Sequence, residues 1–356
     1  MAQAPVPQRS DTLLADVLEE IQARFPLQPR PYAAVGTMLG VGEEEVLACV
    51  AGARDTGILR QVSAIFDTRS LGYHSSLVAM RVRPGRLERA VAVVDAHPGV
   101  THNYLRDHNF NLWFTLAVPP GGDLDAVVKR MHELAAADCT RALPTLRLFK
   151  VGVVLRTDGA ARRKHDPGAS YGEGKQARAR GRVLDDEDRA FVLAAQDDLS
   201  READPFATIG ERLGWSVEQS VERARSLQAS GQMRRFGALL NHRRAGFVAN
   251  GMVVWNVPGD QVEAFGLAAG ALPAVTHCYQ RPTYTDWPYN VFTMIHGRTR
   301  AEVERVVNDI EQSTSVRDRA ILYSTTEFKK VRMRYFEPEE QLWEERCMAA
   351  AERWGR

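Results

Sequence analysis

The chain has few cysteines, no long apolar run and almost no net charge. Its four cysteines, among 356 residues, are scattered without a CxxC or similar close spacing, which argues against a zinc site, an iron–sulfur cluster or a disulfide scaffold. No segment approaches the about 18 continuous apolar residues of a membrane-spanning helix, and the first residues contain no apolar signal core. The formal net charge is +1, so no overall field attracts nucleic acid or an anionic membrane. We expect a cytoplasmic protein without a membrane partner.

The sequence repeats itself once, with a period of about 175 residues. Gly72 matches Gly246, His102 matches His277, and the alignment needs only short insertions, mainly in the loop at 282–288. The chain is therefore a tandem duplication.

A helix-turn-helix unit opens each half. In the first half, helices are predicted from about Thr12 to Phe25, from Pro31 to Leu39 and from about Glu43 to Thr56. The second half repeats this order, and Ser216 and Gln219 have the spacing of a capping box.

Each helical unit is followed by strands and helices in the order βαββαβ, whose last strand is predicted at Leu146 to Leu155 and at Ile321 to Phe336. This order predicts a ferredoxin-like sandwich, with both helices on one face of an antiparallel sheet. The fold class is therefore α+β, a tandem duplication of a winged helix-turn-helix domain and a ferredoxin-like domain. The predicted domains are helix-turn-helix domain 1 (1–62), ferredoxin-like domain 1 (63–156), a linker rich in Gly, Arg, Lys and Ala (157–183), helix-turn-helix domain 2 (184–237), ferredoxin-like domain 2 (238–337) and a C-terminal helix (338–356).

Two polar strand pairs, VTHNYLRDHNFNLWFTL at 100–116 and VTHCYQRPTYTDWPYNVFTMIH at 275–296, carry most of the chemistry. A strand face that served only as core would carry Val, Ile and Leu, so a polar ligand is expected to bind here. In the first pair, alternation places residues on one face of each strand: His102, Tyr104 and Arg106 on one strand, and Asn111, Trp113 and Thr115 on the next.

The helix-turn-helix units raise the question of DNA binding. Recognition helices present basic and amide side chains to bases and phosphates. Here the first candidate helix opens with Glu43, Glu44 and Glu45, and the second carries Glu218 and Glu222. Carboxylates that face phosphates oppose the electrostatic attraction on which DNA affinity depends, so these units are expected to serve as scaffold and interface.

A helix-turn-helix followed by βαββαβ resembles the Lrp/AsnC family of transcription regulators, and the resemblance covers both halves. Two long motifs make the resemblance more specific. HNFNLWFTL at 108–116 and RPTYTDWPYNVFTMIHGR at 281–298 resemble the motifs of the two related subunits of the siroheme decarboxylases. Both motifs in one chain indicate the fused form found in the d1-type heme biosynthesis of denitrification.

The resemblance implies a carbon–carbon lyase that removes carbon dioxide from two acetate side chains of siroheme, giving didecarboxysiroheme without oxidation and without an added cofactor. Siroheme is a planar ring with eight carboxylates, so its site needs cationic clamps and flat walls. The residues predicted to bind it are Tyr104, Asn111, Trp113, Lys150, Tyr279, Tyr284, Trp287, Asn290, His296 and Lys329.

Loss of carbon dioxide leaves a carbanion beside the pyrrole, which a general acid can protonate, and histidine has a suitable pKa. The predicted catalytic residues are His102, Arg106, His108, His277 and Arg281. Several alternatives stay open. A strand histidine is often a packing residue, and one histidine is an alternative axial ligand of the siroheme iron. Both tryptophans can be plain core, and both asparagines can simply tie the backbone.

The alternative function is a ligand-sensing transcription regulator of the Lrp/AsnC type. Under either function, the two ferredoxin-like domains are expected to pair within the chain. Because the motifs of the halves differ, the two pockets are not equivalent, and one is expected to be catalytic and the other degenerate. The sequence leaves open which pocket is catalytic and whether the whole chain forms a homodimer.

Overall fold

A computed structural model describes residues 9–151, 183–240, 249–337, 342–343 and 345–346. These residues divide into two compact units. The first unit comprises the described residues of Met1–Tyr73, Tyr171–Arg243 and Arg334–Phe336, and the second those of His74–Ser170, Arg244–Met333 and Glu337–Arg356. Each unit therefore contains a part of both halves of the duplication. The predicted linker, apart from its last residue, and most of the predicted C-terminal helix lie outside the described residues.

The first unit contains two helix-turn-helix groups, as predicted. Gly40 and Gly214 end the second helix of each group with φ 71°, a left-handed conformation that glycine adopts without strain. Ser216 and Gln219 form the predicted capping box. The elements are α1 (Arg9–Ala23), α2 (Pro31–Leu39), α3 (Glu43–Asp55), β1 (Leu59–Phe66), α7 (Asp186–Ala195), α8 (Pro205–Leu213), α9 (Val217–Ala229) and β7 (Met233–Leu240).

The two groups of this unit share a small sheet and an aromatic core. Strands β1 and β7 pair antiparallel, with Val62 opposite Ala238. Phe25 of the first half packs on Phe206 and Phe236 of the second, with ring centroids 6.3 and 5.1 Å apart. Because aromatic rings bury a large apolar area, this contact binds the halves into one unit.

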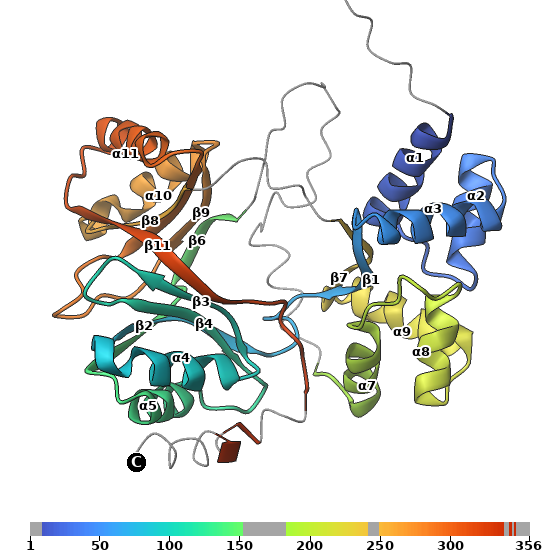
Figure 1. Cartoon of the computed structure of the whole chain (residues 1–356), viewed down its shortest axis with the longest axis horizontal. Coiled ribbons are helices and arrows are strands. Elements are labelled where there is room, and N and C mark those ends of the chain that lie inside the picture. Colours follow the sequence, from blue (N-terminus) through green and yellow to red (C-terminus); the bar gives the residue numbers. More distant parts are fainter. Residues whose placement is uncertain (1–8, 152–182, 241–248, 338–341, 344, 347–356) are drawn as a thin grey trace, which may run out of the picture. The chain divides into compact units, whose positions relative to one another are not determined.

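The second unit contains two βαβ-type layers, each with its helices on one face of the sheet (Figure 1). The first half supplies β2 (His74–Arg81), η1 (Pro84–Arg86), α4 (Leu87–Ala96), β3 (Val100–Arg106), β4 (Leu112–Val118), α5 (Leu124–Ala135), β5 (Cys139–Pro144) and β6 (Arg147–Val151). The second half supplies β8 (Ala249–Trp255), η2 (Gly259–Gln261), α10 (Val262–Ala271), β9 (Val275–Gln280), β10 (Val291–Gly297), α11 (Arg300–Thr314) and β11 (Arg319–Lys330).

The halves of the second unit pair with each other through their last strands. Among the described residues, the strand order is β5-β2-β4-β3-β11-β8-β10-β9-β6. The start of β11 pairs with β8 of its own half and its end pairs with β3 of the first half. Likewise β5 pairs with β2, while β6 pairs with β9 of the second half. The expected pairing of the two ferredoxin-like domains within one chain is therefore present.

Two predicted strands differ from the structure. The last strand of the first half, predicted from Leu146 to Leu155, corresponds to β6, which begins at Arg147, and residues 152–155 lie outside the described residues. The prediction missed β5, which precedes β6 and is separated from it by Thr145 and Leu146. The sequence CTRALP of β5 lacks a clear apolar alternation, and its pairing with β2 determines its conformation instead.

The prediction of a strand up to Phe336 is also wrong, because β11 ends at Lys330. The residues that follow belong to the first unit, where the backbone amide of Tyr335 donates to Gln196 and its hydroxyl lies 2.8 Å from that of Thr68. The sequence pattern predicts a strand up to Phe336, but the contacts of these last residues with the first unit end the strand earlier.

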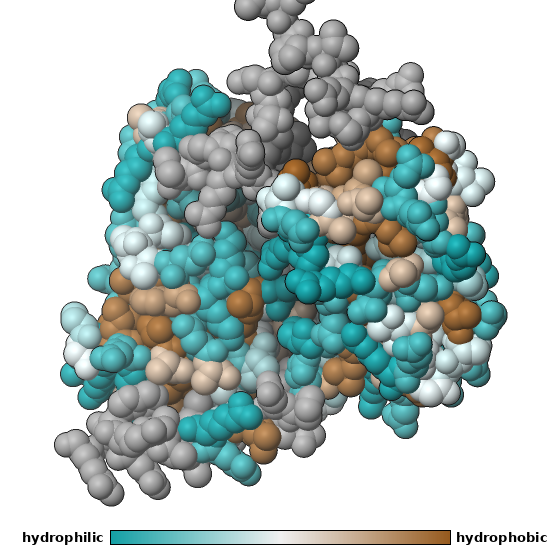
Figure 2. Space-filling view, turned by 45° about the vertical axis from the view of Figure 1, so that its right-hand side comes forward, coloured by the Kyte–Doolittle hydropathy of each residue, from teal (hydrophilic) through white to brown (hydrophobic). Residues whose placement is uncertain are grey.

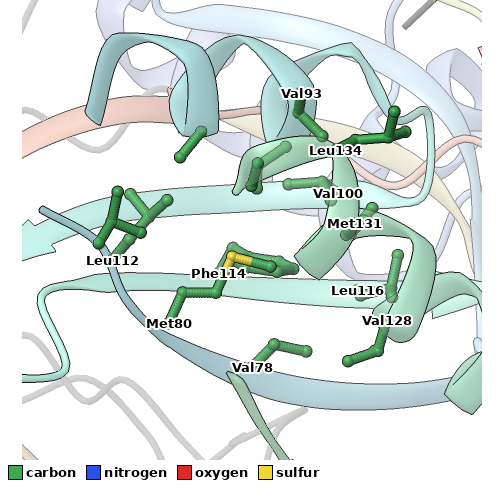
Figure 3. Close-up of a cluster of buried hydrophobic side chains, with 14 of the residues drawn as sticks. Val78, Met80, Val93, Val100, Leu112, Phe114, Leu116, Val128, Met131 and Leu134 are labelled. Atoms are coloured by element: carbon green, nitrogen blue, oxygen red, sulfur yellow. The ribbon is translucent and has the colours of Figure 1, made fainter. Parts of the chain in front are cut away.

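Among the described residues, the core of the second unit has three clusters of buried side chains. One lies between the sheet of the first half and its helices α4 and α5, and includes Val78, Met80, Phe114 and Met131 (Figure 3). A second fills the same place in the second half, below α10 and α11. The third joins the halves on the faces that the helices leave uncovered. Its central contact is between Trp113 and Trp287, whose ring centroids are 5.2 Å apart.

Among the described residues, no helix is long and apolar enough to cross a membrane. On the face that Figure 2 shows, hydrophilic residues predominate and hydrophobic ones occur in separate patches.

Candidate functional site

The predicted site residues of β3 share one face of the strand, as expected. Asn103 faces α4 and donates to Asp95 at 2.9 Å, so its neighbours His102 and Tyr104 point to the opposite face, away from the helices. The rings of His102 and Tyr104 are stacked with centroids 6.2 Å apart. The guanidinium carbon of Arg106 lies 5.6 Å from the centre of the Tyr104 ring. Imidazole, phenol and guanidinium thus form one continuous stack.

Strand β9 repeats this stack in the second half. Cys278 belongs to the helix-side core, so His277 and Tyr279 point away from the helices. Their rings are stacked with centroids 6.0 Å apart, and the guanidinium carbon of Arg281 lies 4.8 Å from the Tyr279 ring. The duplication therefore produces two equivalent sets of three residues.

The two arginines are buried and reach into the other half. Arg106 is 5% exposed, and its Nη1 donates to the carbonyl of Leu322 at 2.9 Å. Arg281 is 8% exposed and donates to the carbonyl of Leu143, the matching position of the first half. Burial lowers the pKa of Arg106 to about 10. These contacts hold both guanidinium groups on the uncovered sheet faces.

Arg106 is a buried cation without a matching anion. Among the described residues it forms no salt bridge, and its Nε has no hydrogen-bond partner. A buried charge is costly unless it is paired, and a guanidinium binds carboxylates in two-pronged geometry. The side chain is therefore suited to bind a carboxylate that enters this face.

The candidate histidines are held in the neutral form. Burial, followed by the charge of the neighbouring His296, lowers the pKa of His277 to about 4. Burial also lowers the pKa of His102 and of His296, and Lys330 is the next cause in both cases. The pKa of His108 is lowered by burial as well. Glu327 raises the pKa of His102 and Asp107 raises that of His108, but burial outweighs both carboxylates. A general acid must carry a proton, so these histidines need a further negative charge nearby before they can donate one.

Lys330 was not predicted as a site residue, yet it lies opposite His102 in the β3–β11 pairing. The sequence did hold a signal. On a strand, Lys330 points to the face opposite that of Lys329. To choose between Lys329 and Lys330, one has to know which of them lies on the same face of the sheet as His102, and this depends on how β11 pairs with β3.

The two tryptophans lie in the core, as the alternative interpretation proposed. Trp113 and Trp287 are each 1% exposed, and Nε1 of Trp113 donates to the carbonyl of Phe110 at 2.6 Å. Trp287 also packs edge-on against His108, with ring centroids 5.4 Å apart, while Nδ1 of His108 accepts from the amide of Phe110. Direct contact of either indole with a ligand stays a prediction.

The two asparagines bind backbone. Oδ1 of Asn111 accepts from the amide of Val82 at 3.0 Å, and its Nδ2 donates to the carbonyl of Val82 at 2.8 Å. Asn290 makes the same pair of bonds to Val257, at 2.9 and 2.8 Å. Both ends of each amide are therefore occupied. This geometry favours the alternative in which the asparagines tie the backbone.

The two lysines bind helix ends in the free protein. Nζ of Lys329 donates to the carbonyls of Asp95 and His97 at the end of α4, at 2.7 and 3.0 Å. Nζ of Lys150 donates to the carbonyl of Leu272 at the end of α10, at 2.7 Å. A cation at a helix C-terminus satisfies carbonyls and favours the helix dipole. The geometry thus shows a structural role for both, and a clamp on substrate carboxylates stays a prediction.

The helix-end role of Lys329 can be measured without any ligand. We expect Lys329→Met to lower the free energy of unfolding by about 1–2 kcal/mol, because two carbonyls lose a charged donor. The neighbouring Lys330→Met is the control, and its exposed charge should change stability by less than about 0.5 kcal/mol. Urea denaturation of the two variants gives both values. Equal stability of both variants and the wild type would leave the clamp as the better account of Lys329.

Tyr284 fastens the inserted loop to the first half. Its hydroxyl donates to the carbonyl of Ala142 at 2.5 Å, and the guanidinium of Arg141 lies 4.9 Å from its ring. Arg141 also forms two bonds with Asp286, at 2.9 and 3.0 Å. These contacts hold Trp287 in the core, and contact of Tyr284 with the macrocycle stays a prediction.

A hollow of about 590 Å³ lies beside His296 and the polar side of α11. Its lining includes Arg305 but also the carboxylates of Glu302 and Asp309. Two carboxylates repel a polyanion. This hollow is therefore a poor site for a ligand with many carboxylates.

The recognition helices remain acidic in the structure. Glu43, Glu44 and Glu45 form the first turn of α3. In α9, Arg223 donates to Asp185 and Asp188, the latter at 2.8 Å. A guanidinium already bonded to carboxylates is a poor phosphate contact. The expectation that DNA is not the main ligand stays a prediction.

Family models match the chain twice each. A model described as an AsnC-like ligand binding domain matches residues 70–150 and 244–329. A model described as a siroheme decarboxylase NirDL-like HTH domain matches residues 15–60 and 188–234. The order of the four matches agrees with the tandem duplication and with the two units of the fold.

Individual proteins match over most of the chain. The siroheme decarboxylase of Hydrogenobacter thermophilus is 37% identical over 335 residues, which cover 94% of this chain and 98% of that protein. The siroheme decarboxylase beta subunit of Methanosarcina barkeri is 42% identical over 151 residues, or 42% of this chain and 99% of that one. The crystal structure of the siroheme decarboxylase NirDL in co-complex with an iron-uroporphyrin III analogue superposes with a TM-score of 0.76, at 33% identity, and covers 94% of this chain and 98% of that one.

Proposed function

The chain belongs to the siroheme decarboxylase family, and from this premise we propose that it removes the carboxylates of two acetate side chains of siroheme to give didecarboxysiroheme. The observation that carries the proposal is the match to a siroheme decarboxylase across both halves, 37% identical and covering 98% of that protein. The enzyme is then a carbon–carbon lyase that contributes to d1-type heme formation and acts in the cytoplasm.

The reaction replaces each carboxylate by a hydrogen. The bond between the carboxyl carbon and the methylene breaks, carbon dioxide leaves, and the electron pair that remains on the methylene takes up one proton, which leaves a methyl group. No oxidant is required, and we propose that the substrate's own iron is the only metal involved. The protein must therefore hold the carboxylate and supply one proton for each step.

The side chains of the uncovered faces fit these two tasks. Arg106 is a buried cation with an Nε that has no partner among the described residues, and it can bind a carboxylate of the substrate. His102 and His296 are neutral near pH 7, and both lie within the electrostatic reach of Lys330. The carboxylates of siroheme would raise the pKa of these imidazoles. We propose that the substrate thereby supplies the charge that turns a neutral histidine into the acid.

The two halves act as one enzyme in this proposal. The relative from Methanosarcina barkeri is a single subunit of about half the length, and here the halves pair through β3 with β11 and through β6 with β9. A further homodimer of the whole chain remains a prediction.

The reaction can be tested on the purified chain. We expect anaerobic incubation with siroheme, without any added cofactor, to give a tetrapyrrole that has lost two carbon dioxide units by mass spectrometry. Heat-denatured protein is the control. An unchanged mass together with a shifted absorption spectrum would show binding without turnover. Combined with a gel shift on promoter DNA far tighter than on random DNA, it would favour the regulator instead.

A further inference from the structure

A row of polar side chains crosses four neighbouring strands of the second unit. Ser324 of β11 lies opposite Arg106 of β3. On the other side of β11, Tyr323 pairs with Gly251, which brings Ser324 next to Asn250 of β8. Asn250 in turn lies opposite His296 of β10. Neither Ser324 nor Asn250 belongs to the two polar strand pairs at 100–116 and 275–296.

All members of the row point to the face that the helices leave uncovered. Leu322 and Met252 belong to the cluster on that face, and alternation places Ser324 and Asn250 on the same side as these neighbours. His296 follows Met294 and Phe292 on that face in the same way. Since β11 and β10 are regular up to these positions, the side chains share one surface.

Three of these residues have a buried polar atom without a hydrogen-bond partner among the described residues. They are Nε of Arg106, Oγ of Ser324 and Oδ1 of Asn250. Each such atom costs about 1–3 kcal/mol relative to a bonded one, so three on adjacent strands are unusual for a site that only packs. Ser324 can donate its hydroxyl, and a half-turn of the Asn250 amide exchanges its oxygen for its N–H group.

A second row occupies the positions that the repeat matches to the first, and it differs in its side chains. Arg281 occupies the place of Arg106, and Thr145 and Ser75 occupy those of Ser324 and Asn250 in the repeat. Ala117, opposite Ser75, takes the place of His296. This second row therefore has a guanidinium but no imidazole. The first row combines Arg106 of the first half with Ser324, Asn250 and His296 of the second.

We propose that Arg106, Ser324 and Asn250 together bind one acetate carboxylate of the tetrapyrrole, beside His296. This inference rests on the proposed function. It means that residues of both halves form the reacting pocket. An acetate is short enough to reach a row that lies on the sheet surface, while the macrocycle stays outside it. His296 is then the proton donor nearest to the reacting methylene in this row. In the second row, the guanidinium of Arg281 holds a carboxylate without help from Thr145 or Ser75, and that carboxylate does not react.

The inference can be tested with two tetrapyrroles that differ in their acetates. Iron-uroporphyrin III carries four acetates and four propionates, whereas in iron-coproporphyrin III methyl groups replace the acetates. We expect Ser324→Ala and Asn250→Ala each to weaken binding of iron-uroporphyrin III about tenfold in an absorption titration, as the loss of one hydrogen bond to a charged group predicts. Binding of iron-coproporphyrin III should change less than about twofold.

Variants of the second row are the matched controls. Thr145→Val and Ser75→Ala should change the affinity for either tetrapyrrole by less than about twofold and leave the rate of carbon dioxide loss from siroheme unchanged. Ser324→Ala and Asn250→Ala each remove a buried oxygen that has no hydrogen-bond partner among the described residues, so the fold is expected to stay intact. Thermal unfolding of all four variants checks this.

The outcomes separate the inference from the proposed function. Equal losses for the two tetrapyrroles, or equal losses in the two rows, would overturn the inference although the wild type still decarboxylates siroheme. A wild type that binds iron-uroporphyrin III but releases no carbon dioxide from siroheme would overturn the proposed function, and the inference with it.

Discussion

An Arg106→Met variant is expected to lose at least about 30-fold in the rate of carbon dioxide loss at subsaturating siroheme while it unfolds at no lower temperature than the wild type. The loss follows because a carboxylate held by a buried guanidinium contributes about 2–5 kcal/mol to binding, and about 2 kcal/mol corresponds to about 30-fold. The preserved stability follows because Arg106 is 5% exposed and, among the described residues, its guanidinium meets the carbonyl of Leu322 rather than a carboxylate. Replacement of such a charge by an apolar side chain of similar length is neutral or stabilising.

The comparison with Arg281→Met identifies the reacting pocket. Arg281 is the repeat partner of Arg106 and bonds the matching carbonyl, that of Leu143. We expect its replacement to weaken substrate binding but to reduce the rate less than the change at Arg106, since its row lacks an imidazole. Single-turnover mass spectrometry and calorimetry on both variants give the two quantities. Equal, partial losses in the two variants would contradict a single reacting pocket, and a large loss of stability at Arg106 would contradict a mainly functional role.

Much of this site could be predicted from the sequence, because its residues alternate along single strands. The period of two in His102, Tyr104 and Arg106 predicts a shared face, and the structure confirms the stack. The matching positions of the repeat, His277 and Arg281, follow in the same way. Periodicity within one strand thus suffices for side chains that are near neighbours along the chain.

Contacts between the halves could not be predicted in this way. Ser324 and Asn250 meet Arg106 and His296 only because β11 crosses from β8 to β3, and no local pattern encodes that pairing. The same crossing places Lys329 at the end of α4, where its ammonium binds helix carbonyls. A lysine in a polar motif looks like an anion clamp until its tertiary partner is known.

The free protein is expected to lose stability as the pH falls from about 7 to 5, because its buried histidines resist protonation. Burial lowers the pKa of His277 to about 4 and that of His97 to about 3. In the unfolded chain both imidazoles take up protons near pH 6.5, so the unfolded state binds more protons in this interval and stability rises with pH. At pH 5 each histidine should cost about 2 kcal/mol relative to pH 7. The loss grows until the pH reaches the folded pKa.

His277→Gln should remove about 2 kcal/mol of this pH-dependent loss, as measured by urea denaturation at the two pH values. His74→Gln, at an exposed strand position, is the control and should leave the loss unchanged. If His277→Gln shows the same difference between pH 7 and 5 as the wild type, then His277 is already protonated in the fold and its burial does not govern its charge.

Bound substrate should raise the pKa of the histidines on the uncovered face but not that of His97. His97 packs against Trp343 in the helix-side core, with ring centroids 4.7 Å apart, whereas His277 and His296 lie on the uncovered face. A bound tetrapyrrole with eight carboxylates raises the pKa of nearby imidazoles, so its binding near pH 6 should take up protons. Calorimetric titration with iron-uroporphyrin III in buffers of different ionisation enthalpy measures this uptake, which His277→Gln and His296→Gln should each reduce. Binding without proton uptake would mean that the histidines stay neutral beside the ligand, and the proton for the new methyl group would then come from solvent.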